Sequence, residues 1–182
     1  METEKQIIID ENHALLKREG YFFKEFPSDI RQVRFFSMLI VQKAPPEIKE
    51  INLLEQQISE LIKNAVRHGN KNDINKKVRV WADFSVDHAH VIVEDEGEGF
   101  KKLEEWNEFN RKRNECFASQ DFEKMEKYFA FRTEESNEND GGNALFATLE
   151  YWDGGVVFNK KKNCVAVYKN FGKKKYGLEL NK

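Results

Sequence analysis

One amphipathic segment constrains the fold of this chain more than any other feature. The break "APPE" (44–47) precedes it and Gly69 follows it, so the pattern predicts a helix over 48–68. Placed at 100° per residue, its apolar side chains share one arc, which consists of Ile51, Leu54, Ile58, Leu61, Ile62, Ala65 and Val66. We expect this arc to be buried against another layer of the domain.

Three polar side chains follow the flank of that arc. Glu60, Asn64 and His68 are each one helical turn apart and lie at the border between core and solvent. A carboxylate in this position is suited to proton transfer, and an amide oxygen is a suitable ligand for Mg²⁺. The alternative is that Glu60 and Asn64 are ordinary polar residues at a helix border.

The rest of the pattern predicts the other elements. Strands are expected at 21–26, 78–85 and 89–95, and a hairpin at 155–169. Helices are expected at 27–43 and 144–152, with a charged helical stretch over 101–132. The order indicates one α+β domain over residues 1–182, a two-layer sandwich with helices on one face of a mixed, mostly antiparallel sheet.

Charge and cysteine content exclude several classes. Thirty basic residues against 32 acidic ones give a net charge of −2, so the composition predicts no direct binding of nucleic acid. Cys116 and Cys164 provide neither a disulfide framework nor a zinc-ligand spacing. The N-terminus is too charged for a signal peptide and no apolar run is long enough to span a bilayer, so we expect a cytoplasmic protein without membrane contact.

Two glycine-containing stretches are candidate ligand sites. In "VIVEDEGEGF" (91–100), Asp95 ends a hydrophobic strand and can accept a hydrogen bond from an exocyclic amine such as that of adenine. Gly97 and Gly99 allow the backbone to approach a ligand closely. Gly141 and Gly142 precede a short helix, where exposed N–H groups can hold phosphate. These are neither Rossmann nor Walker patterns, and a turn and a flexible loop are the alternatives.

Together these stretches resemble the Bergerat-type ATP-binding fold, and within it the anti-sigma-factor serine kinases of bacteria. Glu60 and Asn64 in "ELIKNAVRHG" match the family's N-box, Glu-x-x-x-Asn. "DEGEG" (95–99) matches the first glycine box, Asp-x-Gly-x-Gly, and "GNAL" (142–145) matches part of the second. The chain departs from the family pattern where Ala144 replaces a glycine and Cys164 replaces a threonine that contacts the nucleotide near adenine.

The resemblance implies a role for each matched residue. Glu60 would be the general base, and Asn64 would hold the Mg²⁺ that bridges the phosphates of ATP. The adenine would lie on the first glycine box and the phosphates under the second, which assigns nucleotide contacts to Asp95, Gly97, Gly99, Gly141 and Gly142. Arg67 and Arg132 are candidates for phosphate contact, with a solvated surface charge as the alternative for each. The long insertion at 101–140 would form a helical, mobile lid.

The resemblance also implies partners. It predicts a serine protein kinase that binds a sigma factor and phosphorylates a small anti-anti-sigma antagonist. It further suggests a homodimer through 21–36, where Phe22, Phe23, Phe35 and Phe36 offer apolar surface. The alternative is that these phenylalanines fill the core. Two other functions stay open: a nucleotide-dependent protein-binding module without kinase activity, and an ATP hydrolase in which Glu60 activates water.

Overall fold

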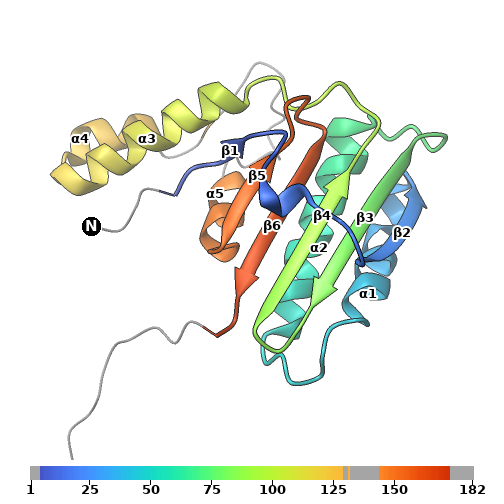
Figure 1. Cartoon of the computed structure of the whole chain (residues 1–182). Helices are drawn as coiled ribbons and strands as arrows, with labels where there is room; N and C mark the ends of the chain where they lie inside the picture. Colours follow the sequence, from blue (N-terminus) through green and yellow to red (C-terminus); the bar gives the residue numbers. More distant parts are fainter. Residues whose placement is uncertain (1–4, 129–130, 132–143, 173–182) are drawn as a thin grey trace, which may run out of the picture.

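A six-stranded sheet organises the domain. The computed structural model describes residues 5–128, 131 and 144–172 (Figure 1). The strands are β1 (Ile8–Ile9), β2 (Phe22–Pro27), β3 (Lys77–Phe84), β4 (His88–Glu94), β5 (Gly155–Phe158) and β6 (Cys164–Asn170). Their order across the sheet is β1-β5-β6-β4-β3-β2. β1 runs parallel to β5 and every other pair is antiparallel, which confirms the predicted mixed sheet.

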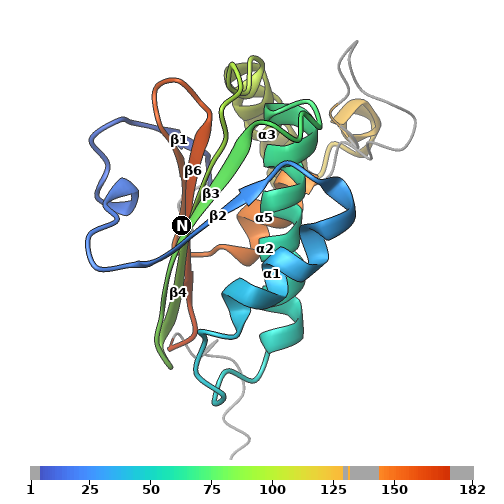
Figure 2. The ribbon, with the colours of Figure 1, turned by 90° about the vertical axis from the view of Figure 1, so that its right-hand side faces the viewer.

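Helices cover one face of this sheet. α1 (Val33–Val41), α2 (Ile51–Asn64) and α5 (Ala144–Tyr151) all lie on the same side in Figure 2, so the predicted two-layer α+β class is confirmed. The apolar arc of α2 is buried as expected, and Leu54, Ile58 and Ile62 are fully inaccessible. β3 and β4 meet it with Val80, Val91 and Val93, so α2 is fixed against the middle of the sheet.

The N-terminal segment covers the opposite face, which the sequence pattern did not predict. Residues 10–20 cross that face around a 3₁₀ turn at Ala14–Leu16 (Figure 2). Leu15 and Leu16 pack on a small apolar cluster that includes Ile92. Arg18 stacks over the ring of Trp81 at 4.0 Å and donates to the Glu94 carboxylate at 2.8 Å. Both faces of the sheet are therefore covered near β4.

The segment after β4 contains two helices, within the stretch over 101–132 that was expected to be helical. α3 (Leu103–Ser119) is followed by α4 (Phe122–Met125) and a 3₁₀ turn at Glu126–Tyr128, and the two helices extend outward beside β1 (Figure 1). The first half of α3 is packed into the domain. Leu103 and Trp106 are fully buried, and the Trp106 ring lies 4.9 Å from that of Phe146. This half is part of the core, and the expectation that the segment 101–140 is a mobile cover stays a prediction.

Asn107 joins α3 to the edge of the sheet. Its side chain accepts from the Ile7 amide at 3.2 Å and donates to the Ile7 carbonyl at 2.8 Å. Replacing Asn107 by alanine removes both bonds, and we expect a loss of about 1–2 kcal/mol in the free energy of unfolding. Urea denaturation measures this change. The control is Asn52→Ala on an exposed position of α2, and equal effects of both variants would contradict the role of Asn107.

The four phenylalanines of the predicted dimer surface divide into two pairs. Phe36 is buried and stacks on Phe26 at 4.2 Å, so the prediction that it lies on a dimer surface is wrong, whereas Phe22 is half-buried against the core. Phe23 and Phe35 remain 46% and 57% exposed.

In the part of the chain that the structure describes, no helix is both long and apolar enough to cross a membrane.

Candidate functional site

The C-terminal end of α2 brings the helix to the loop after β4. The helix continues as a wider, π-helical turn over Ala65–Gly69, in which the Asn70 amide donates to the Ala65 carbonyl at 2.8 Å, five residues back. Turns of this kind occur often at functional sites, because the extra residue redirects the backbone. Here the turn contains Arg67, which is half-buried, and His68, which is exposed.

Gly69 is the contact point between the two predicted motifs. A Cβ atom at this position would lie only 2.3 Å from Cγ of Asp95, so no larger side chain fits against the carboxyl group. A Cβ at Gly97 would likewise lie 2.2 Å from the Gly69 carbonyl oxygen. The "HGN" that ends the helix therefore packs directly on the "DEG" that follows β4. This explains why a glycine ends α2 at this point.

The Asp95 carboxylate is partly withdrawn from water. Its Oδ1 accepts from the Gly97 amide at 2.8 Å, which turns the carboxyl group toward the helix end. Burial raises the pKa of Asp95 to about 6, although the Gly97 hydrogen bond and the nearby Lys161 both act to lower it. Asp95 is thus a desolvated acceptor at the end of a rigid strand, and such an acceptor is suited to an amine donor.

The turn between β5 and β6 packs against the other side of the loop that follows β4. The Asp95 amide donates to the Asn163 carbonyl at 2.9 Å, and the Phe100 amide donates to the Lys162 carbonyl at 3.0 Å. Gly99 has a φ of +90°, and a Cβ there would lie 1.9 Å from the Lys161 carbonyl oxygen. The sequence "NKKKN" (159–163) indicates only a turn, and its residue types give no sign of these backbone contacts with the loop after β4.

Glu60 and Asn64 lie further back along α2. At the normal helical rise, Asn64 is roughly 7 Å and Glu60 roughly 13 Å from Gly69 along the axis. Asn64 is half-buried, whereas the Glu60 side chain is 44% exposed and forms an ion pair with Lys63. Asn64 is therefore the nearer and Glu60 the more distant of the two from the Gly69–Asp95 contact, measured along the helix.

The remaining candidate residues lie in different parts of the chain. Gly141, Gly142 and Arg132 lie outside the described residues, so their assignments stay predictions. Ala144 begins α5 and is exposed. Cys164 packs with Ile92 under the N-terminal segment, on the sheet face away from α2. Its thiol accepts from Arg18 there, so the substitution lies on the side of the sheet away from the α2–Asp95 junction.

The described side chains could hold Mg²⁺ only together with ligands from a nucleotide and from water. Among residues 5–128, 131 and 144–172, no group of three or more histidine, cysteine, aspartate or glutamate side chains could enclose a metal ion. Mg²⁺ in nucleotide sites takes one or two protein ligands, with phosphates and water completing the octahedron. A single amide oxygen from Asn64 fits that arrangement.

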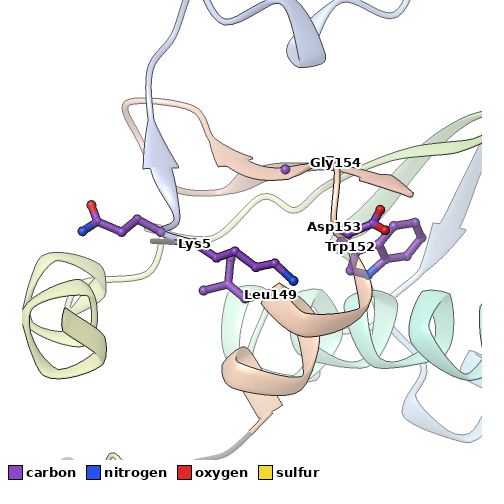
Figure 3. Close-up of a pocket in the computed structure, with 7 residues that line it drawn as sticks. Lys5, Leu149, Trp152, Asp153 and Gly154 are labelled. Carbon is purple, nitrogen blue, oxygen red and sulfur yellow. The ribbon is translucent and has the colours of Figure 1, made fainter. Parts of the chain in front are cut away.

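Two shallow hollows lie away from these residues. One, of about 190 Å³, is lined by Lys5, Leu149, Trp152 and Asp153 among others, and Figure 3 shows them converging from the N-terminal segment and the end of α5. The other, of about 230 Å³, lies between Gln6 and α3. Neither hollow is lined by a residue of either predicted motif. The junction of α2 with Asp95 is therefore the better candidate for the ligand site.

Comparisons with known proteins agree with this geometry. The model of the histidine kinase-like ATPase domain matches residues 23–169. Among curated proteins, the chain is 34% identical to the anti-sigma F factor of Clostridium perfringens over 68 residues, which cover 37% of this chain and 49% of that protein. It is 31% identical to the anti-sigma F factor of Shouchella clausii over 65 residues, 36% of this chain and 44% of that protein. The chain thus spans about half the length of these relatives.

Proposed function

The chain belongs to the histidine kinase-like ATPase domain family, and on that premise we propose that it binds Mg²⁺-ATP and acts as an anti-sigma serine protein kinase. The observation that carries this proposal is the fit of Gly69 against the Asp95 carboxyl group. That fit joins the N-box helix to the first glycine box as one surface. The similarity to anti-sigma F factors supports the choice of a regulatory kinase within the family.

Each described residue has one task in the proposed reaction. Asp95 accepts from the adenine amine, and Gly97 and Gly99 leave room for the base. Asn64 holds Mg²⁺, which neutralises charge on the phosphates when it is bound. Glu60 accepts the proton of a serine hydroxyl on the partner protein. At the same time, the oxygen of that serine forms a bond to the γ-phosphorus of ATP. The bond from that phosphorus to the β-phosphate bridging oxygen breaks, and ADP leaves.

The partners belong to the same proposal. We infer a sigma factor as the protein that is held, and a small anti-anti-sigma antagonist as the protein that is phosphorylated, in the cytoplasm. A homodimer through β2 and α1 is supported by the exposure of Phe23, Phe35 and Met38. Residues 1–182 would form one domain, in which 101–140 is an insertion between the two glycine boxes. Phosphate contact by Arg67 is a further part of this proposal.

A second candidate function follows from the state of Glu60. Its carboxylate is paired with Lys63, so Glu60 must leave or share this ion pair before it can accept a proton. If it does not, the domain would bind nucleotide and partner without transferring phosphate. This nucleotide-dependent binding module differs from the kinase in one measurable respect, which is the absence of phosphoserine on the partner.

The test is capture of partners from the native cell with ATP, ADP or no nucleotide. We expect a sigma factor and a small antagonist to be retained in a pattern that depends on the nucleotide. Incubation with γ-labelled ATP and Mg²⁺ should then place label on a serine of the antagonist. Nucleotide-dependent capture without label would select the binding module, and release of labelled phosphate without a partner would select hydrolysis.

If the same proteins were captured with ATP, with ADP and without nucleotide, and no serine were labelled, the regulatory proposal would be refuted. Asp95→Asn provides the matched control in the same pull-down, because it changes one atom of the side chain at the proposed base contact. We expect its partner set to be equal under the three conditions.

A further inference from the structure

Two asparagines hold the loop between β4 and α3 from opposite sides. This loop, residues 95–99, is called the glycine loop below. Asn70 lies at its α2 side and Asn163 at its β6 side. Neither residue belongs to the matched motifs, yet both bond to the backbone at or next to Asp95.

Asn70 connects three separate parts of the domain. It is completely inaccessible to solvent. Its amide nitrogen donates to the Ser28 hydroxyl at 2.8 Å, just after β2, and to the Lys77 carbonyl at 2.9 Å, at the start of β3. Its Oδ1 accepts from the Glu96 amide at 2.8 Å. Both N–H groups and the carbonyl oxygen of the buried side chain are thus used to join the sheet to the glycine loop.

Asn163 holds the other side of the same loop. Its Nδ2 donates to the Asp95 carbonyl at 2.6 Å, while its own carbonyl accepts from the Asp95 amide at 2.9 Å. The side chain is oriented by Asn159, whose Nδ2 donates to Asn163 Oδ1 at 3.0 Å. Asp95 is therefore bonded at both of its backbone groups to a single residue of the β5–β6 turn.

We propose that Asn70 and Asn163 are positioning residues that set the selectivity for the base of the nucleotide. Between them they fix the amide and carbonyl of Asp95 and the amide that follows it. The direction of a side chain follows from the backbone on either side, so these bonds aim the carboxylate. The inference rests on the proposed nucleotide site and adds to it the residues that discriminate an adenine amine.

The experiment compares ADP with inosine diphosphate, in which a carbonyl oxygen replaces the exocyclic amine. Isothermal titration gives both affinities for the wild type, Asn163→Ala and Asn70→Ala. We expect the wild type to prefer ADP, and each variant to lose affinity for ADP by about tenfold, with little change for inosine diphosphate. A purely structural role would weaken both nucleotides equally, so the ratio of the two affinities is the decisive quantity.

Two matched variants provide controls. Ser28→Ala removes a bond of Asn70 to the body of the domain and leaves the bond to the Glu96 amide, so it should keep the preference for ADP. Asn75→Ala changes an exposed asparagine whose side chain bonds to Asp73 in the same turn, and should have no effect. Thermal unfolding without nucleotide reports the stability of each variant separately.

Each outcome supports or overturns the inference. Should Asn70→Ala fail to fold, Asn163→Ala retains the test, because the Glu96 carboxylate still anchors the loop to the Lys77 amide and Arg79. An unchanged ratio of affinities in a folded Asn163→Ala variant overturns the positioning role. A wild type that binds neither nucleotide overturns the proposed function itself, and this result is distinct from a wild type that binds both equally, which removes only the amine contact.

Discussion

Glu60→Gln is expected to lower the rate of phosphotransfer to the antagonist by roughly 100-fold or more, while nucleotide affinity stays within a few-fold. The amide cannot accept the serine proton, and general-base catalysis contributes about that factor. The change is isosteric, and the side chain lies on an exposed flank of α2 beside Lys63, so the fold should be unaffected. Single-turnover transfer of labelled phosphate measures the rate, and calorimetry with ADP measures the affinity.

The ion pair needs its own control, because Glu60→Gln also removes the partner of Lys63. Lys63→Gln breaks the same pair but keeps the carboxylate, so it should retain phosphotransfer within a few-fold of the wild type. Glu47→Gln makes the same chemical change at an exposed position before α2. If Lys63→Gln were as slow as Glu60→Gln, the ion pair and not proton transfer would explain the loss. Equal rates in Glu60→Gln and wild type would remove Glu60 as the base.

Asp95→Asn should weaken ATP and ADP binding by roughly 30- to 150-fold. One acceptor oxygen becomes a donor amide facing the adenine amine, and a charged hydrogen bond left unmet costs about 2–3 kcal/mol. Asp95 is half-buried, and its carboxyl group lies so close to Gly69 that the new side chain has little space to turn away on that side. Titration calorimetry at pH 7.5 measures the loss. Glu98→Gln, on the exposed part of the same loop, is the matched control and should bind normally.

The raised pKa of Asp95 adds a dependence on pH with a defined sign. Its folded pKa of about 6 exceeds the ordinary 3.8, so between these values the folded state binds more protons than the unfolded state. Asp95 should therefore contribute less to the stability of the nucleotide-free protein as pH rises from about 4 to 6, and this contribution should be missing from Asp95→Asn. Nucleotide affinity should change in the opposite direction, since the ionised carboxylate is the better acceptor.

These two measurements separate recognition from stability. At pH 7 the Asp95→Asn variant should unfold at a higher temperature than the wild type without nucleotide, yet bind ADP more weakly. A variant that lost both stability and affinity would show that Asp95 is a structural residue. Unchanged affinity would show that the adenine does not lie against Asp95.

Much of the helical layer could be predicted from the sequence, because the apolar residues of α2 recur at helical spacing and so identify its buried side. The spacing of Leu54, Ile58 and Ile62 fixes which face is buried, and that in turn places Glu60 and Asn64 on the flank. The end of β4 was predictable for the same reason, since a run of apolar residues stops at Asp95. Local periodicity was sufficient wherever an element buries one face on its own.

Contacts between distant segments could not be predicted in this way. β1 has two residues and forms only because β5 lies beside it, so Ile8 and Ile9 carry no alternating pattern. The turn at 159–163 reads as lysines in solvent, and its contacts with the glycine loop come from backbone carbonyls, which the residue types do not indicate. Asn70 looked like part of a helix stop, and its role depends on Ser28 and Glu96, which lie far from it in the chain.

The position of the β5–β6 turn also determines when the site becomes complete during synthesis. β2, β3 and β4 are formed from the first half of the chain, and the N-box helix and Asp95 emerge from the ribosome with them. The turn that bonds to Asp95 emerges later than these elements, and the bond between Glu11 and the Lys160 amide then closes a separation of 149 positions. Closing so long a segment is a slow step in folding. A nascent chain would thus expose both nucleotide motifs before it could retain a nucleotide.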